Sequence, residues 1–187
     1  QTTTLKGVEL DEARRKGMAL FVPPAKPTPD KVKAEKTAYD ADLEVGQKVG
    51  GHLILETMEE VDVEHGTVRV LVMARGLSSV VVGRVAKSGL DEYLEGVTEG
   101  LEEEGCKALP TTGGVHRWTR EEKGLTFVFR LVVVEVGDTR LAVVVSGGGF
   151  DVKAATAEAD KATDTFLKEL NAPVTGKPKK VGKKNIL

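Results

Sequence analysis

Apolar positions are densest between Gly124 and Phe150, where the sequence reads GLTFVFRLVVVEVGDTRLAVVVSGGGF. Two apolar runs flank Gly137-Asp138, and a two-residue loop that begins with glycine is typical of a type II′ hairpin. Closing the turn at this point predicts four cross-strand pairs: Val136 with Thr139, Val134 with Leu141, Val132 with Val143 and Leu131 with Val144. We therefore expect a long antiparallel hairpin at the centre of the fold.

Both faces of this hairpin are largely apolar. One face carries Phe127, Phe129, Leu131 and Val133, and the other carries Val128, Val132, Val134 and Val136. A hairpin of this kind must be covered on both faces, which predicts an α+β fold with an antiparallel sheet between helices, a three-layer α/β/α sandwich. We expect four valines to be among the most buried residues: Val132, Val134, Val143 and Val144.

Weaker period-two patterns predict three further strands before the hairpin. Residues 53–64 and 67–74 read as two strands joined at His65-Gly66, and residues 78–85 read as a third. Five acidic side chains crowd the first strand: Glu56, Glu59, Glu60, Asp62 and Glu64. Charge on an outer strand blocks pairing with another chain, so we expect this strand at an edge of the sheet or in a solvated extension.

A first amphipathic helix is expected between the third strand and the hairpin. It opens at Ser88, where Asp91 completes a weakened capping box, and it stops at Gly105. Gly96 and Gly100 lie inside it, and each costs roughly 1 kcal/mol relative to alanine. We therefore expect a neighbouring backbone to approach both glycines closely.

A second amphipathic helix follows the hairpin. The glycines at 147–149 are expected to leave the sheet in a turn, after which Asp151 caps a helix that runs to about Leu170. Its apolar stripe has helical spacing and consists of Val152, Ala155, Ala159, Ala162, Phe166 and Leu170.

The two ends of the chain read as extensions of one domain at residues 51–172. Residues 1–50 are expected to form an arm, because the prolines between Pro23 and Pro29 exclude regular helix and interior strand. Asp30 is expected to cap a polar helix that runs to about Tyr39. Residues 173–187 read as a flexible, lysine-rich tail.

The charge pattern bears on the choice of partner. The net charge is −2, and residues 177–187 hold five lysines and no acid, which leaves −7 on the rest of the chain. An acidic body argues against specific nucleic-acid binding, which requires a basic surface. If the tail has a function, we expect it to contact an anionic surface or an acidic partner.

Length and composition indicate a single domain with no transmembrane segment, because no apolar run approaches the ~20 residues of a membrane span. Cys106 is the only cysteine, so an internal disulfide is excluded. The opening residues, Gln1 and three threonines, are compatible with removal of a signal peptide and equally with an artificially shortened chain. We expect a secreted or periplasmic location, with a cytoplasmic location as the alternative.

Motifs for metal, anion or covalent chemistry are weak. The borderline metal ligands are His52, His65, His116 and Cys106, and no two of them have the close spacing of a ligand pair. The glycine-rich segment at 146–151 resembles an anion-binding loop, but Asp151 places a carboxylate where the anion would lie. We expect no metal and no cofactor, and we expect Cys106 to be half-buried and unreactive.

The strongest candidate binding cluster precedes the central hairpin. His116, Arg117, Trp118 and Arg120 interleave aromatic and basic side chains, which are favoured anchors for an acidic or aromatic ligand. The alternative is an edge strand with Trp118 lying on the core.

Three segments together carry a resemblance to a known fold: LDEYLEGVTEGLEEEG (90–105), the stretch at 124–150 and DVKAATAEADKATDTFLKEL (151–170). This order resembles the PsbP/Mog1-like fold, which includes small bacterial envelope lipoproteins. The resemblance covers less than half of the chain and has no signature motif. It implies an antiparallel sheet between helices in proteins that mostly bind or scaffold, and it carries no functional residue over.

The sequence therefore predicts a non-catalytic secreted or cell-envelope protein that binds another protein or serves as a subunit of an assembly. The alternative is a small-molecule carrier with a pocket between sheet and helix. An enzyme would need an acid-base set that the sequence does not supply.

Overall fold

The computed structural model describes residues 29–62 and 66–179 and contains a ten-stranded sheet and two α-helices. The strands are β1 (Asp30–Lys33), β2 (Lys48–Val49), β3 (His52–Asp62), β4 (Gly66–Arg75), β5 (Ser78–Ala86), β6 (Lys107–Ala108), β7 (His116–Glu122), β8 (Leu125–Val136), β9 (Thr139–Gly149) and β10 (Val174–Thr175). The helices are α2 (Leu90–Glu103) and α3 (Val152–Lys168), with short 3-10 turns at Ala38–Asp40 and Lys87–Gly89.

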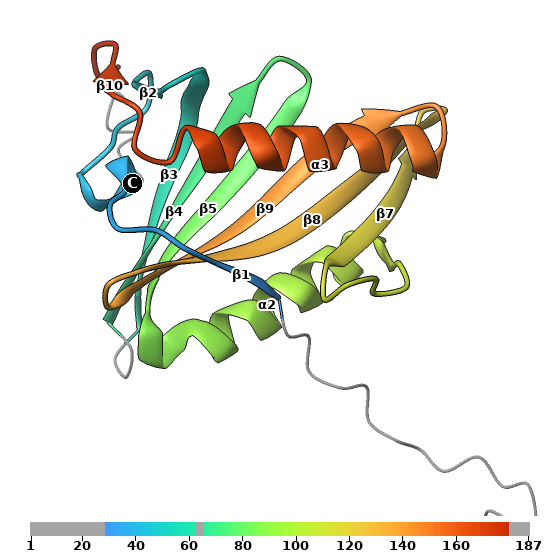
Figure 1. The fold of residues 1–187 in the computed structure, drawn as a ribbon, viewed down its shortest axis with the longest axis horizontal. Coiled ribbons are helices and arrows are strands. Elements are labelled where there is room, and N and C mark those ends of the chain that lie inside the picture. The colour runs from blue at the N-terminus through green and yellow to red at the C-terminus, as the bar shows by residue number, and fades with distance from the viewer. Residues whose placement is uncertain (1–28, 63–65, 180–187) are drawn as a thin grey trace, which may run out of the picture.

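The strands form one continuous sheet in the order β10-β2-β3-β4-β5-β9-β8-β7-β6, and every neighbouring pair on this path is antiparallel (Figure 1). β1 lies off this path and pairs in parallel with Val132–Glu135 of β8. These residues directly follow Leu131, which pairs with His116, the first residue of β7. The expectation of a mixed α and β fold built on a large antiparallel sheet is confirmed.

The central hairpin has the predicted register, with all four expected pairs present. Gly137 has φ +55°, whereas Asp138 stays out of the positive-φ region, as a type II′ turn requires. Val132, Val134 and Val143 are fully buried. The expectation for Val144 is wrong, because this side chain is only half-buried at the border of a groove beside α2.

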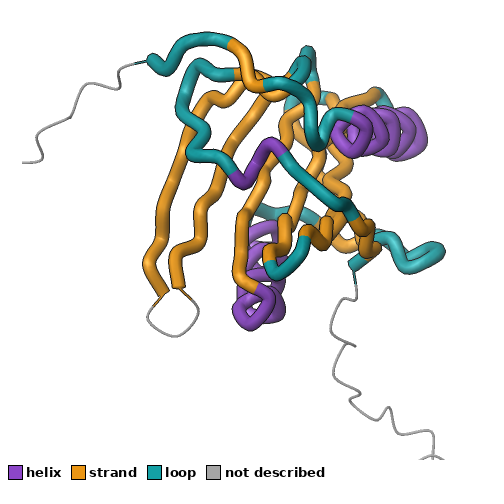
Figure 2. Tube along the Cα trace, turned by 60° about the vertical axis from the view of Figure 1, so that its left-hand side comes forward, coloured by secondary structure: helices purple, strands orange, loops and turns teal. Residues whose placement is uncertain are grey.

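The two helices contact side chains of opposite parity on β8. Ala155 and Ala159 of α3 pack against Val128, and Phe166 shares a cluster with Val132 and Val134. Leu90 and Leu94 of α2 pack instead with Leu131, Val133 and Ala142. Figure 2 shows α2 and α3 as two separate helices beside the strands of the sheet. The apolar character of both parities along β8 is thus accounted for by two different partners.

Gly147–Gly149 do not leave the sheet as a turn, because all three residues belong to β9 and pair with Thr126, Phe127 and Val128. A Cβ atom on Gly147 would overlap the backbone nitrogen of Ala159, and one on Gly149 would lie 2.6 Å from the backbone nitrogen of Ala155. The missing side chains therefore let α3 pack directly on the backbone of β9.

The expectation for the glycines of α2 is wrong. A Cβ atom on Gly96 or on Gly100 would meet nothing within 4 Å. The Ser88 cap is also wrong, since residues 87–89 form a 3-10 turn and Gly89 precedes α2 without a side-chain cap. The stop at Gly105 is confirmed, because its φ of +83° allows Cys106 N–H to donate to the Leu101 carbonyl.

Asp151 caps α3 as predicted, and its carboxylate accepts a 2.7 Å hydrogen bond from the Ala154 N–H. The helix then runs through Lys168, close to the expected end. Ala155, Ala159 and Phe166 are buried, whereas Val152 at the first turn remains 41% exposed. The apolar stripe of α3 is therefore confirmed except at its N-terminal end.

Residues 30–49 belong to the core rather than to an arm. Asp30 begins strand β1 instead of capping a helix. β7 pairs only with β8 residues up to Leu131, so the backbone groups of the following β8 residues on that edge are free to pair with β1. Tyr39, Leu43 and Val49 are almost completely buried in the main core cluster. Residues 1–28, which hold the rest of the predicted arm, lie outside the described residues.

The described part of the predicted tail is packed against the same region. β10 pairs with β2, and the Lys179 N–H donates a 2.8 Å hydrogen bond to the Val45 carbonyl. Residues 180–187 lie outside the described part of the chain. Within the described ranges, neither α2 nor α3 has the length and hydropathy needed to span a bilayer.

Candidate functional site

The four residues of the predicted binding cluster divide between two environments. Trp118 is 3% exposed and packs with Leu90, Leu94 and Cys106 beneath α2, which matches the alternative that it lies on the core. The His116 ring lies 6.4 Å from the Trp118 ring. Arg117 directly follows His116 on β7. Because successive side chains of a strand point in opposite directions, the Arg117 side chain points away from Trp118 and His116 and contacts Asp160 of α3. The four side chains do not converge on one ligand position.

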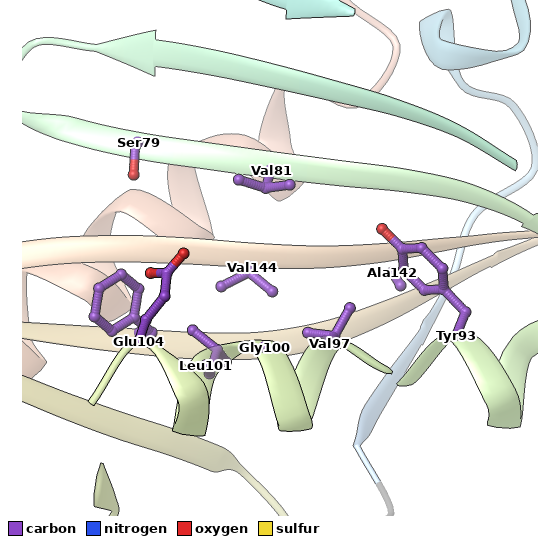
Figure 3. A pocket seen from close by; sticks show the side chains of 10 residues that line it. Ser79, Val81, Tyr93, Val97, Gly100, Leu101, Glu104, Ala142 and Val144 are labelled. Atoms are coloured by element: carbon purple, nitrogen blue, oxygen red, sulfur yellow. The ribbon is translucent and has the colours of Figure 1, made fainter. Parts of the chain in front are cut away.

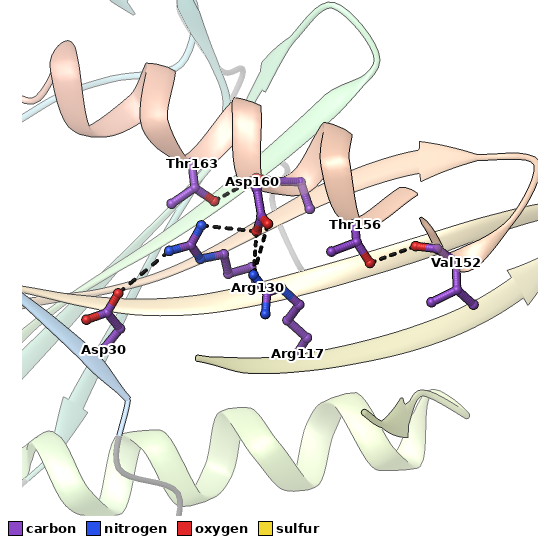
Figure 4. Close-up of polar contacts among 8 residues, drawn as sticks. Asp30, Arg117, Arg130, Val152, Thr156, Asp160 and Thr163 are labelled. Atoms are coloured by element: carbon purple, nitrogen blue, oxygen red, sulfur yellow. Dashed lines mark hydrogen bonds and ion pairs between the residues drawn. The ribbon is translucent and has the colours of Figure 1, made fainter. Parts of the chain in front are cut away.

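Arg117 belongs to a network of ion pairs that links four elements (Figure 4). Asp160 of α3 accepts hydrogen bonds from Arg117 of β7 at 2.8 Å and from Arg130 of β8 at 3.0 Å. Arg130 also lies 3.6 Å from Asp30 of β1. Both arginine side chains are largely buried, so we assign them the structural role of holding β1 and α3 on the sheet.

A groove of about 240 Å³ lies between α2 and the sheet and is partly open to solvent (Figure 3). The sheet contributes Ser79, Val81, Phe129, Ala142 and Val144, and the helix contributes Tyr93, Val97, Gly100 and Leu101, with Glu104 at its C-terminus. The lining is therefore mainly apolar, with two hydroxyl groups and one carboxylate.

Strand and helix periodicity explain this lining. Ser79 and Val81 are two positions apart on β5 and point to the same face, opposite to the buried Val80 and Val82. Tyr93, Val97 and Leu101 repeat every four residues and form one stripe of α2. Gly100 lies beside that stripe without a side chain, so the helical wall of the groove is low at this point.

Arg120 marks one end of the groove. Its guanidinium group lies 3.2 Å from the carboxylate of Glu104 and 5.7 Å from the centroid of the Phe129 ring. Both partners line the groove. Arg120 is thus the member of the predicted cluster that the structure places at the groove, through contacts that sequence spacing did not indicate.

Apolar surface continues from the groove across the next two strands. Val72 of β4 is paired with Val81, Ala74 is paired with Ser79, and Met58 of β3 is paired with Val70. We call this surface the open sheet face and define it by Leu53, Met58, Val70, Val72 and Ala74. Four of these side chains are half-buried and Met58 is 44% exposed. Sequence reasoning missed this surface because it depends on where α2 lies.

The candidate metal and anion ligands do not assemble. Among the described residues, no group of three His, Cys, Asp or Glu side chains is placed to hold a metal ion. His65 lies outside those residues. Cys106 is buried rather than half-buried, and burial raises the pKa of its thiol, which opposes thiolate chemistry. The segment at 146–151 is occupied by α3 packing and by the Asp151 cap.

A separate polar cluster lies at the opposite end of α3. His52 is 1% exposed, and its Nδ1 atom lies 3.3 Å from Oε2 of Glu169. The same carboxylate accepts a hydrogen bond from the Gly51 N–H and pairs with Arg75. The His52 ring packs edge-on against Phe166 in the core. Because the imidazole is buried, the cluster is suited to stabilising the fold rather than to meeting a ligand.

Acidification is expected to destabilise the fold through His52. Burial lowers the pKa of His52 below its ordinary 6.5, outweighing the Glu169 carboxylate, which raises it. Below pH 6.5, His52 is protonated more readily in the unfolded chain than in the folded protein. The free energy of unfolding therefore decreases as the pH falls below 6.5. Urea denaturation between about pH 7.5 and 5.5 measures this slope. His52→Gln should flatten this slope; an unchanged slope in His52→Gln would contradict the assignment.

Comparisons of the chain with protein-family models, curated proteins and solved structures found no match.

Proposed function

We propose that this protein is a non-catalytic binding protein that acts by engaging another protein or as a subunit of an assembly. The observation that carries the proposal is the continuity of the α2 groove with the open sheet face. Contiguous exposed apolar side chains of this kind are typical of interaction sites on otherwise polar proteins. A secreted or cell-envelope location forms part of the proposal.

The same proposal includes a finer architecture, a three-layer α/β/α sandwich of the PsbP/Mog1-like kind with helices on both faces of the sheet. Support comes from the opposite parities of the β8 side chains that α2 and α3 contact. In such a sandwich the groove is the border between one helical layer and a part of the sheet that this layer leaves uncovered.

A groove-filling variant tests the proposed function. Gly100→Phe places a ring beside the groove, and a Cβ atom at this position meets nothing within 4 Å, so the fold should be retained. Ala157→Phe adds the same ring at an exposed position of α3 and serves as the control. Immobilised wild-type protein and both variants are incubated with extract of the native source, and retained proteins are quantified by mass spectrometry.

We expect one partner to be retained by the wild-type protein and by Ala157→Phe but lost from Gly100→Phe. Equal retention of the same proteins by all three would contradict the use of the groove. Circular dichroism and melting temperatures establish that the variants are folded, and Gly100→Phe should melt no lower, because replacing a helical glycine adds up to ~1 kcal/mol.

A second candidate function is small-molecule carriage, favoured by the groove volume of about 240 Å³. Ligand pockets commonly measure ~300–1,000 Å³, so the groove suits a short apolar ligand. Native mass spectrometry of protein isolated from its source would then show a bound mass that Gly100→Phe lacks.

A further inference from the structure

We propose that the groove and the open sheet face hold a positively charged amphipathic helix of a protein partner. This inference rests on the proposed function and specifies the chemistry of the partner. Four observations carry it: the apolar floor, the acidic walls, the two uncovered glycines of α2 and the width of the surface.

The floor is apolar and accessible. Val81 and Val144 line the groove and are half-buried, and Val72 continues the surface onto β4. Side chains of this kind bind the apolar face of an amphipathic helix in groove-type recognition. The floor therefore requires a partner segment with one apolar face.

The walls are acidic. Residues 90–105 contain seven acidic side chains and neither lysine nor arginine. Glu99 and Glu103 are both exposed and lie one helical turn apart, on the side of α2 adjoining its glycines. At the far margin of the open sheet face, Glu56 of β3 is exposed, lies between Leu53 and Met58, and is paired with Val72. A segment bound between these walls is stabilised by lysine or arginine along both margins of its apolar face.

The glycines of α2 make its groove side low. Gly96 and Gly100 are four residues apart and therefore lie on one side of the helix. A Cβ atom at either position would meet nothing within 4 Å, so no described residue accounts for their small size. Small side chains on a helix surface allow a second helix to approach closely. These positions favour a partner helix that lies beside α2.

The dimensions fit one helix. Neighbouring strands are ~4.8 Å apart, so the sheet from β5 across β4 to β3 is ~10 Å wide. An α-helix with its side chains measures ~10–12 Å across. α2 runs roughly along the strands (Figure 3), so a partner helix can lie next to it over the uncovered part of the sheet.

Fluorescence anisotropy with a synthetic helix tests the inference. The probe is a labelled peptide of leucine and lysine with leucines at helical spacing, and the matched probes replace lysine by glutamate or scramble the order. We expect the lysine peptide to bind the wild-type protein, with an affinity that falls as salt is added. The glutamate and scrambled peptides should bind at least about tenfold more weakly.

Two pairs of variants locate the site. Gly100→Phe should weaken binding of the lysine peptide about tenfold, whereas Ala157→Phe should not change it. The double variant Glu99→Lys with Glu103→Lys should weaken binding and reduce its salt dependence, whereas Asp164→Lys on the exposed side of α3 should have a much smaller effect.

Several results would overturn the inference: no binding of the lysine peptide, equal binding of the glutamate peptide, or equal binding by Gly100→Phe. A concentration-dependent dimer of the wild-type protein that Gly100→Phe abolishes would identify a second copy of this chain as the occupant instead. A partner lost from Gly100→Phe in the extract experiment, together with failure of the peptide experiment, would retain the proposed function and reject the basic helix.

Discussion

Val143→Asp is expected to abolish folding. Val143 is fully buried in the main core cluster and is paired with the equally buried Val132 across the central hairpin. A carboxylate at this position loses its hydration and gains no counter-charge among the apolar side chains of the cluster. Burying the charged carboxylate costs more than the ~5–15 kcal/mol stability of a typical domain. Protonation avoids the charge, but burying the unpaired carboxyl group still costs several kcal/mol, to which the lost packing of the valine is added.

The measurement is the far-ultraviolet circular dichroism spectrum and the thermal transition of the purified variant. We expect no cooperative transition, and recovery of the protein mainly from the insoluble fraction. Val143→Ala is the control, because it removes two methyl groups without adding charge and should cost ~2 kcal/mol while the protein still folds. A cooperatively folded Val143→Asp would show that the register of the hairpin permits another orientation.

Gly147→Ala is expected to destabilise the protein by ~3 kcal/mol or more. Its Cβ atom would overlap the backbone nitrogen of Ala159 and would lie 2.7 Å from the carbonyl carbon of Glu158. Backbone atoms inside a helix cannot rotate away as a side chain can, so α3 as a whole must move from β9. That movement opens the contacts of Ala155 and Ala159 with Val128.

The control lies next to it in the same strand. A Cβ atom on Gly148 would meet only the Phe127 ring, at 3.3 Å, on the opposite face of β9. Gly148→Ala should therefore cost much less than Gly147→Ala, although both remove one strand glycine. Urea denaturation of the two variants gives the comparison; equal losses would mean that β9 is sensitive to any side chain there and not to the approach of α3.

Sequence reasoning succeeded where local pattern and tertiary packing impose the same demand. Gly137 selects a two-residue turn, and apolar side chains of both parities of β8 are buried, as their pattern indicates. The Asp151 cap and the Gly105 stop also depend on backbone geometry within a few residues. Such features can be derived from a short window of the chain.

Features that depend on distant segments could not be derived in this way. The glycines of β9 resemble a loop in sequence. Glycine is needed there because the backbone of α3, which follows later in the chain, packs directly against β9. β1 reads as a polar helix because its partner is β8, about a hundred residues later. A pocket between sheet and helix is one of the alternatives that the sequence offers, but its position and the open sheet face beside it depend on where α2 lies, which residue periodicity does not encode.

The parallel pairing of β1 with β8 has a consequence for synthesis on the ribosome. Asp30–Lys33 are made before the residues with which they pair, Val132–Glu135, which emerge about a hundred residues later. During that interval β8 is not there for β1 to pair with, and three of the four side chains of β1, Asp30, Lys31 and Lys33, are charged. These charges disfavour pairing with a strand of another chain. β1 can thus join the sheet only after its partner strand, β8, has left the exit tunnel.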